Sequence, residues 1–463
     1  MRKGRNRVGE KARRYGSVDV GDLTRVFEPW LDTGAALGQP VRDRLFAPAR
    51  VFWLFLSQMF SADGSCAETV KKFLAWLALA EGKEASPNTA AYCKARARLP
   101  MEAVERVGND VVRTIRHSPL AQSRWHGRPV KVVDGSGLSM PDTPANQEEY
   151  PQSRKRTAGC GFPEMRIVAL FSLATGALLH YAQASRYESE RALFRQLWTY
   201  FEPGDVALAD RGFCGFAEIY LLRQRGVDSV MRLHQRRSTG VRLVKRLGRG
   251  DLLVEWIKTK VRPKWLTAEQ WAAMPHTLLV RHITYSIDIP GFRTQRITIA
   301  TTLTDARLFP PQAFAQLFRR RWNVELYFRD IKISLRMDVL RCLTPEMVRK
   351  ELAMHVIAYN LIRATLLQAA QAANKDVDRM SFKGTCQTLR EWAPLLALAP
   401  NTERSHLHAA LLNAIARAPV PARPNRTEPR AKKRRPKNYQ LLNKPRHLFK
   451  EIPHRNKYTR TLS

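Results

Sequence analysis

The chain has 463 residues, and its 44% hydrophobic content is that of a folded protein with room for more than one domain. Its 78 Lys and Arg outnumber 41 Asp and Glu, and the net charge of +37 favours a polyanionic partner, above all nucleic acid. The six cysteines include no Cys-x-x-Cys pair, which argues against a zinc ribbon or a disulfide framework and fits the reduced cytosol.

The sequence predicts no membrane span. Its most apolar run, residues 51–60, is too short to cross a bilayer and is interrupted by Ser57 and Gln58. The basic N-terminus is not followed by the apolar stretch of a secretory signal. We therefore expect a cytoplasmic, nucleoid-associated bacterial protein without a membrane role.

Helices are predicted between about residues 20 and 120, because apolar residues recur there at three- and four-residue spacing. The segments with this spacing are 41–60, 67–82 and 100–117. Before the third of them, Ser86 is a good N-cap and Pro87 suits the first position of a short helix.

That short helix carries Lys94, Arg96 and Arg98. Two helices joined by a tight turn, with the second one basic, indicate a helix-turn-helix that contacts DNA through these three side chains. The alternative is a plain helical bundle with a solvated basic face.

A different pattern begins near residue 129. Short β-branched or apolar runs alternate with amphipathic segments in the order three strands, helix, strand, helix, strand, and Thr175–Gly176 marks a hairpin between the second and third strands. This is the order of an α/β, RNase H-like catalytic core. The segments are 129–140, 166–185 (two strands), 189–201, 205–213, 215–226 and 227–234.

A β-rich insertion is predicted to interrupt this core. One hairpin turns at Gly248–Gly250, and a second pairs residues 277–289 with 295–303 across Pro290–Gly291. Long helices resume at Pro311 and complete the core.

The C-terminal segment is strongly basic, with 14 Lys or Arg and 2 Glu between Pro421 and Ser463. Few apolar residues accompany them, so we expect it to be extended alone and ordered on an anionic partner. The predicted organisation is a helical DNA-binding domain (1–125), the first part of the core (126–237), the insertion (238–303), the helical completion of the core (304–400) and a basic segment (401–463).

Two candidate catalytic acids follow predicted strands. Asp134 follows Val130–Val133 and Asp210 follows Val206–Ala209, and each has a glycine one or two residues later that would let a ligand approach. Either one alone would more simply begin a turn. Phosphodiester chemistry uses two divalent ions roughly 4 Å apart, held by carboxylates.

A third acid, Glu325, is predicted on a helix. At about 100° per residue, Glu325 and Lys332 fall within about 40° of Arg321, so an acid is flanked by two bases on one stripe. Apolar neighbours at Phe318, Trp322, Leu326 and Phe328 indicate that the helix is substantially buried, which favours a metal-binding acid over a solvated face with Arg–Glu pairs.

Together these residues resemble the DDE transposases of bacterial insertion sequences, in particular the insertion-sequence-four group. That group has a Tyr-Arg-Glu-Lys signature whose spacing is matched here by Phe318, Arg321, Glu325 and Lys332, with phenylalanine in place of tyrosine. Residues 132–142 and 208–215 also look like its first two catalytic segments. The resemblance covers about residues 40 to 460.

The resemblance implies cut-and-paste DNA transposition: strand hydrolysis at the element ends, a hairpin intermediate, and transfer of the 3′-ends into target DNA. It implies Asp134, Asp210 and Glu325 as catalytic and metal-binding residues for two Mg²⁺ (or Mn²⁺) ions, with no organic cofactor. The implied partners are double-stranded DNA, as terminal inverted repeats and target, and a second copy of the chain.

It also implies DNA contacts by Arg321 and Lys332, with Arg211, Phe318 and Trp322 as further candidates. Hairpin formation in this group uses an extruded base stacked on an aromatic ring. The candidates for that ring, which the sequence leaves open, are Trp256, Trp265, Trp271 and Trp322. Glu188 or Glu190 is a candidate auxiliary acid, although a helix N-terminus would explain either charge as well.

Two alternatives stay open. The first is a catalytically inactive, transposase-derived DNA-binding protein or repressor, against which the complete set of three carboxylates argues. The second is a nuclease acting on RNA–DNA hybrids, which would need neither the insertion nor the helical N-terminal domain.

Overall fold

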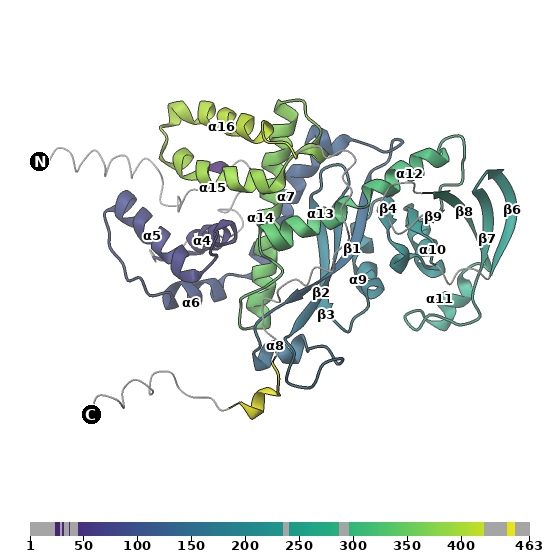
Figure 1. Ribbon diagram of the computed structural model, residues 1–463, viewed down its shortest axis with the longest axis horizontal. Helices are drawn as coiled ribbons and strands as arrows, with labels where there is room; N and C mark the ends of the chain where they lie inside the picture. Colours follow the sequence, from purple (N-terminus) through teal and green to yellow (C-terminus); the bar gives the residue numbers. More distant parts are fainter. Residues whose placement is uncertain are drawn as a thin grey trace, which may run out of the picture.

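The computed structural model describes residues 24–27, 30, 31, 37, 45–234, 240–286, 296–420 and 442–449. Its strands form one mixed nine-stranded sheet in the order β3-β2-β1-β4-β5-β9-β8-β7-β6, and helices pack on this sheet in a mixed α/β architecture (Figure 1). The strands are β1 (Val130–Ser139), β2 (Glu164–Ser172), β3 (Leu178–Ser185), β4 (Val206–Ala209), β5 (Asp228–Arg232), β6 (Val241–Gly248), β7 (Asp251–Ile257), β8 (Thr277–Ser286) and β9 (Arg296–Thr301).

The first five strands have the order predicted from the sequence. β1, β2 and β3 are antiparallel neighbours, and β4 and β5 run parallel to β1 after the helices α9 (Glu190–Gln196) and α10 (Phe216–Gln224). All four residues of β4 are buried, because helices cover both faces of a central parallel strand.

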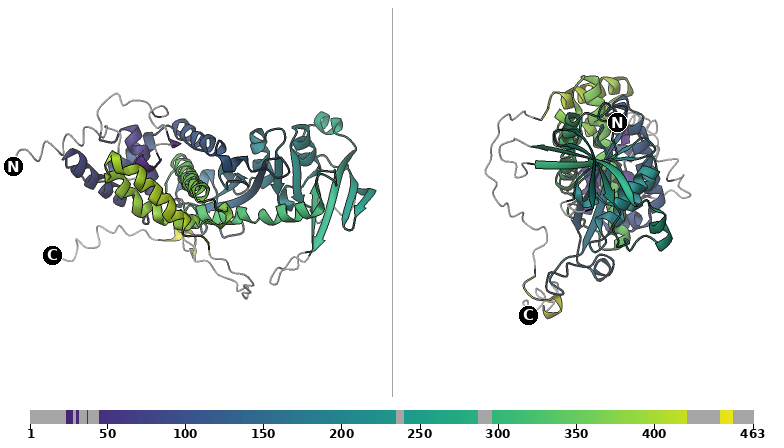
Figure 2. Two further views of the ribbon diagram at one scale, coloured as in Figure 1. Left: turned by 90° about the horizontal axis from the view of Figure 1, so that it is seen from above. Right: turned by 90° about the vertical axis from the view of Figure 1, so that its right-hand side faces the viewer.

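The insertion continues the same sheet. β9 pairs antiparallel with β5, and β8, β7 and β6 follow outward, so the insertion strands lie at the end of the molecule opposite α4–α6 (Figure 2). The predicted hairpin at Gly248–Gly250 and the pairing of the two later strands are confirmed. Pro290–Gly291 and most of the basic tail lie outside the described residues.

A long central helix, α14 (Pro345–Ala372), holds the β2–β3 hairpin. Asn360 hydrogen-bonds both backbone groups of Leu178, and Arg363 donates to the carbonyl oxygen of Thr175. Gly176 has φ +68°, and a Cβ there would lie 2.1 Å from the Arg363 guanidinium, so the predicted hairpin turn requires glycine.

The remaining helices gather at one end of the molecule and along the sheet. They are α2 (Thr24–Phe27), α4 (Pro48–Phe60), α5 (Cys66–Glu81), α6 (Ala90–Arg98), α7 (Met101–Arg116), α8 (Pro144–Glu149), α11 (Ala268–Ala273), α12 (Pro311–Arg320), α13 (Asn323–Arg329), α15 (Phe382–Leu398) and α16 (Asn401–Ala416). None of the helices in the described ranges is long and apolar enough to cross a membrane.

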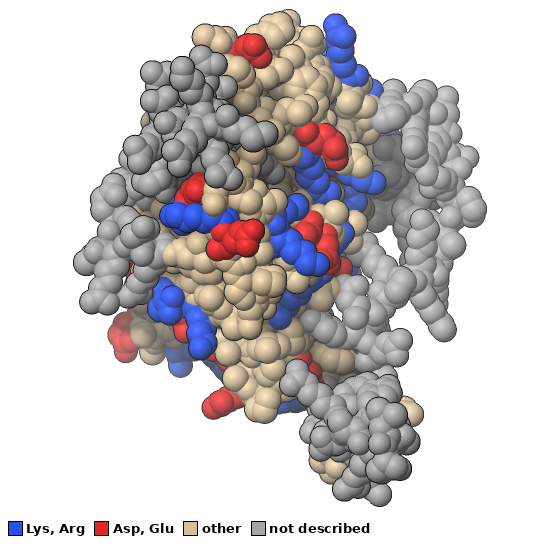
Figure 3. Space-filling view, turned by 90° about the vertical axis from the view of Figure 1, so that its left-hand side faces the viewer, with Lys and Arg blue, Asp and Glu red and all other residues tan. Residues whose placement is uncertain are grey.

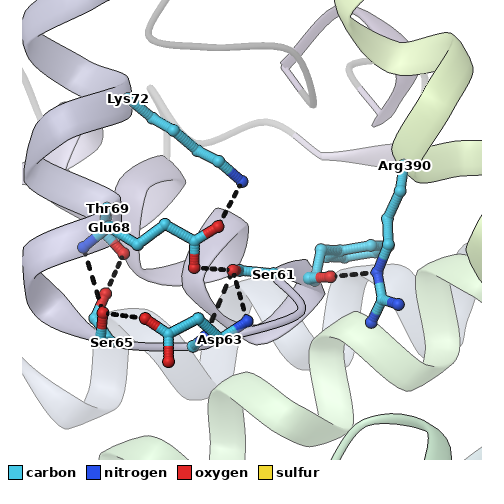
Figure 4. Close-up of polar contacts among 9 residues, drawn as sticks. Ser61, Asp63, Ser65, Glu68, Thr69, Lys72 and Arg390 are labelled. Atoms are coloured by element: carbon cyan, nitrogen blue, oxygen red, sulfur yellow. Dashed lines mark hydrogen bonds and ion pairs between the residues drawn. The ribbon is translucent and has the colours of Figure 1, made fainter.

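The turn between α4 and α5 is tied down by side chains (Figure 4). Ser61 Oγ accepts hydrogen bonds from the backbone N–H groups of Asp63 and Gly64 and donates to the Glu68 carboxylate. Ser65 caps α5 by accepting from the N–H of Glu68, and Arg390 of α15 donates to the carbonyl oxygen of Phe60. The serine bonds hold the turn onto the start of α5, and the Arg390 bond holds the end of α4 against α15.

The predicted tight turn before α6 is wrong. α5 ends at Gly82, which has φ +62°, and α6 begins only at Ala90, after a long connection. Ser86 and Pro87 lie in that connection rather than at the start of α6. There Ser86 Oγ accepts from the N–H of Asn88, and Asn88 Oδ1 accepts from the N–H of Ala90. Such side-chain bonds replace the first helical turn.

Candidate active site

The first two predicted acids lie on neighbouring parallel strands. Val133 of β1 is paired with Ala209 of β4, and Asp134 and Asp210 are the next residue on each strand. Asp134 does not end its strand, as the sequence suggested, because β1 continues to Ser139 against β2. It is β4 that ends there, so the two acids meet at the carboxyl end of β4.

Asp134 is held in a strongly perturbed environment. Its pKa is raised to about 6, first by burial and then by the nearby carboxylates of Asp210 and Glu190, while a hydrogen bond from the N–H of Gly135 and the charge of Arg321 oppose the rise. The pKa is raised mainly because burial disfavours the charged form of the carboxyl group.

Glu325 is the third predicted acid, and it approaches Asp134 from α13. Arg321 lies between two acids, with one guanidinium nitrogen 3.7 Å from Asp134 Oδ2 and another 3.9 Å from Glu325 Oε1. Burial raises the pKa of Glu325, and the charge of Asp210 acts in the same direction against Arg321. The three predicted acids are therefore within electrostatic reach of one another, around Arg321.

The segment that carries Glu325 is not the continuous buried helix that the sequence predicted. α12 ends at Arg320, α13 begins at Asn323, and residues Asp330–Ser334 form a π-helical turn. Trp322 and Leu326 are 43% and 45% exposed, and the Glu325 side chain is 49% exposed. Glu325 thus approaches Arg321 from a solvent-accessible side of α13.

Lys332 reaches β1 from this π-helical turn. Its Nζ donates to Ser136 Oγ (3.1 Å) and to the carbonyl oxygen of Gly137 (2.7 Å). Arg211 directly follows Asp210 and is exposed. Arg321 and Lys332 therefore lie close to the carboxylates, and Arg211 adjoins Asp210 in the chain.

The other residues predicted to contact DNA differ in their exposure to solvent. Phe318 is 3% exposed and packs in the core, so it is not available to DNA. Arg96 is also buried: it donates to Gln58 Oε1 and covers the ring of Phe55. Both predictions need correction, whereas Lys94 and Arg98 are exposed as expected.

The helical end of the molecule shows no broad basic surface on the face seen in Figure 3. Among the residues coloured there, Lys and Arg alternate with Asp, Glu and neutral side chains, and grey residues cover part of the face. The side chains of this view therefore support neither the helix-turn-helix nor the solvated bundle over the other.

The candidate base-stacking tryptophans differ in access. Trp256 is 0% exposed and donates its indole N–H to His282, so it belongs to the core. Trp265 and Trp271 line a cavity of about 400 Å³ beside the segment that follows Asp210, together with the buried Glu218. Trp322 stands exposed next to Arg321.

Residues of α9 support the second catalytic segment, and sequence reasoning missed them. Arg191 donates from Nε to the carbonyl oxygen of Gly212 (2.5 Å), and Arg195 pairs with Glu218 (3.5 Å), whose carboxylate packs on Gly215. No motif marks these contacts, because they join segments that meet only in the folded chain.

The donor set suits a hard divalent cation. Its side-chain donors are carboxylate oxygens, the ligands that Mg²⁺ prefers. The carboxylate of Asp210 has no hydrogen-bond or ion-pair partner among the described residues. In the same described ranges, no three or more acidic, His or Cys side chains are gathered closely enough to enclose an ion, and the Arg321 cation lies between two of the acids. A metal would therefore require Arg321 to shift.

Carboxylates beside the end of a parallel strand, with basic side chains nearby, are compatible with chemistry on phosphodiesters, and similarity to known proteins defines the class. Residues 125–361 match the family model described as the transposase DDE domain, more than half of the chain, and the chain belongs to this family. DNA transposition is thus its class of function.

Its relatives agree with the resemblance stated from the sequence. The chain is 26% identical to the transposase InsG for insertion sequence element IS4 of Escherichia coli (strain K12) over 353 residues, which cover 75% of this chain and 77% of InsG. It is 29% identical to the putative transposase InsZ of the same organism over 105 residues, 22% of this chain and 35% of InsZ. Membership of the insertion-sequence-four group is thereby confirmed.

Among solved structures, the chain aligns with the piggyBac transposase in its synaptic complex with hairpin DNA. The alignment covers 86% of each chain, with 11% identity and a TM-score of 0.42. That similarity is too low to carry an argument about this chain.

Proposed function

We propose that the protein is a metal-dependent DNA transposase with an RNase H-like core, which cleaves the ends of its element and transfers them into target DNA through Asp134, Asp210 and Glu325. The observation that carries the proposal is the approach of Asp134 on β1 and Glu325 on α13 to the buried cation of Arg321, with Asp210, directly after β4, close enough to act on the charge of both acids. Acids so far apart in sequence have no common structural need to meet at one point.

Asp134, Asp210 and Glu325 would hold two Mg²⁺ or Mn²⁺ ions. When bound, such ions activate the attacking oxygen and stabilise the leaving oxygen of a phosphodiester. The protein's own part is to position the DNA backbone. Arg321 and Lys332 lie beside the acids and Arg211 follows Asp210 directly, and cations in this place would hold the phosphates on either side of the scissile bond.

We further propose double-stranded DNA as the partner, recognised at the inverted ends with Lys94 and Arg98 among the contacts, and a homodimer as the working assembly. The net charge of +37 supports DNA binding because each phosphate contact releases condensed counterions. The homodimer and the nucleoid location rest on the family resemblance alone.

Trp322 is the ring that we propose for stacking an extruded base. It is 43% exposed and lies beside Arg321, with the guanidinium 5.8 Å from its ring centre, whereas Trp256 is enclosed. The cavity lined by Trp265 and Trp271 is the competing position. A fluorescent 2-aminopurine placed at the terminal base of a hairpin substrate tests this: its quenching should be lost in Trp322→Ala and retained in Trp265→Ala.

The central experiment uses a plasmid that carries the element's inverted ends. The unmodified protein should cut at the ends only with Mg²⁺, and Glu325→Gln should bind the same DNA without cutting it. Glu403→Gln, an exposed acid on α16, removes the same charge away from the site and should cut normally.

Binding without cleavage by the unmodified protein under all metal conditions would favour the repressor alternative. Equal cleavage by the unmodified protein and Glu325→Gln would show that the third acid is misassigned.

A further inference from the structure

Glu190 lies beside the proposed metal site, against Gly135 of β1. It is the first residue of α9, directly after the cap Ser189, and it is half-buried. Among the described residues its carboxylate has no hydrogen-bond or ion-pair partner. A partly buried charge without a partner is costly unless a ligand compensates it.

The backbone of β1 makes room for this carboxylate. A Cβ at Gly135 would lie 2.7 Å from Glu190 Cδ and 2.8 Å from Oε1, distances that real Cβ atoms do not show. Gly135 does not have a left-handed φ, so its own conformation does not require glycine. Its lack of a side chain instead lets the Glu190 carboxylate rest on the strand one residue from Asp134.

Charge at the site is out of balance. Asp134 and Glu325 lie 3.7 and 3.9 Å from the Arg321 guanidinium, and the Glu190 carboxylate rests against Gly135, the residue next to Asp134. Lys332 donates its hydrogen bonds to Ser136 and Gly137 of β1. The Arg321 guanidinium therefore faces an excess of negative charge.

The Arg321 guanidinium fits poorly between the carboxylates of Asp134 and Glu325. The residue is 7% exposed, its Nε has no hydrogen-bond partner among the described residues, and its terminal nitrogens point at Asp134 and Glu325 from 3.7 and 3.9 Å. These distances are too long for good hydrogen bonds. The guanidinium offsets the negative charge of Asp134 and Glu325 at long range, and a metal ion would bind the same carboxylates at shorter distances.

A favourable charge at a helix N-terminus is the simpler explanation of an acid at this position. It accounts for Glu188, which is exposed and accepts from the N–H of Ser189. It does not account for the contact of Glu190 with Gly135, because an acid that only complements the helix would point to solvent.

We propose that Glu190 is a fourth carboxylate ligand of the divalent-metal site, added from α9 to Asp134, Asp210 and Glu325. The proposal rests on the proposed function, and it assigns to Gly135 the role of admitting this ligand. The four acids on β1, after β4, on α9 and on α13 would then bind the ions together.

The test measures Mn²⁺ binding to the full chain by electron paramagnetic resonance of the free ion, without DNA or turnover. Glu190→Gln should weaken Mn²⁺ binding on the order of tenfold or more. Glu188→Gln removes the same charge two residues away and should bind as the unmodified protein does. Thermal unfolding of each variant separates loss of a ligand from loss of the fold.

Gly135→Ala gives an independent variant that keeps all four acids. Its Cβ must displace the Glu190 carboxylate, so Mn²⁺ binding should weaken, and the loss should add little to that of Glu190→Gln in the double variant. Additive losses would overturn the link between Gly135 and Glu190.

The controls separate the two levels of the proposal. If Glu325→Gln and Asp134→Asn lose Mn²⁺ while Glu190→Gln retains full affinity, Glu190 is not a ligand and the three-acid transposase stands. If the unmodified protein binds no Mn²⁺ at all, the proposed function fails and this inference fails with it.

Discussion

The ionised carboxylate of Asp134 should destabilise the folded, metal-free protein. Replacing Asp134 with asparagine should therefore raise the free energy of unfolding while abolishing cleavage. Its pKa is about 6 in the folded chain against an ordinary value of 3.8. At about 1.4 kcal/mol per pH unit, this difference corresponds to at most about 3 kcal/mol. Because the folded state binds the proton more tightly, the contribution of this group to stability is highest below about pH 4, falls as the pH rises from about 4 to about 6, and is constant above.

The asparagine of this variant resembles the protonated acid and lacks the pH-dependent loss. At pH 7 in EDTA, Asp134→Asn should therefore unfold at a midpoint several degrees above that of the unmodified protein. At pH 4 the two midpoints should converge. Asp330, whose pKa burial also raises to about 6, titrates in both proteins and cancels from the comparison.

Adding Mg²⁺ should reverse the order of the two midpoints. A ligand that binds only the folded state stabilises it in proportion to its occupancy, and the variant has lost a proposed ligand. The reasoning is refuted if Asp134→Asn is equally or less stable than the unmodified protein in EDTA at pH 7. Calorimetry across pH 4 to 8, with and without the metal, provides the complete comparison.

Other changes test burial and charge elsewhere in the molecule. Asp251→Asn should cost about 3–5 kcal/mol in denaturant unfolding, because it leaves the fully buried Arg281 without its paired carboxylate; a loss below about 1 kcal/mol would contradict this. Arg96→Ala should lower the free energy of unfolding by about 2 kcal/mol without weakening DNA binding of the folded protein. Lys94→Ala should weaken DNA binding and leave the stability unchanged, as measured by DNA titrations and thermal melts. Removing residues 421–463, with their 14 Lys or Arg and 2 Glu, should flatten the salt dependence of DNA affinity, and an unchanged slope would exclude tail contacts.

Local patterns were sufficient to predict much of this fold. β-branched runs with bounding glycines located β1, β4 and the insertion strands, and Thr175–Gly176 marked the turn that α14 clamps. These features depend on residues close together in the chain. The signature around Glu325 was found in the same way, by spacing alone.

The errors arose where geometry depends on distant packing. The break between α12 and α13 was missed because the apolar spacing continues through it, although Phe318 and Phe328 are buried while Trp322 and Leu326 face solvent. The burial of Arg96 was predictable. Residues two positions apart on a helix point about 200° away from each other, so Lys94 and Arg96 were never able to share one face.

The contact of Glu190 with Gly135 joins residues 55 positions apart, and no periodicity encodes it. The sequence offered Glu190 as a candidate but gave no reason to prefer it over Glu188. Only the missing Cβ on β1 distinguishes the two.

The pairing of β5 with β9 also bears on how such a chain can change over evolution. After Arg232 the polypeptide forms β6, β7 and β8 at the outer end of the same sheet, returns beside β5 at Arg296, and then enters α12. Segments grafted between these two points can grow, shrink or be exchanged while the exit and the return stay hydrogen-bonded side by side. The distance along the chain from Asp210 to Glu325 can therefore change while β5 and β9 stay paired.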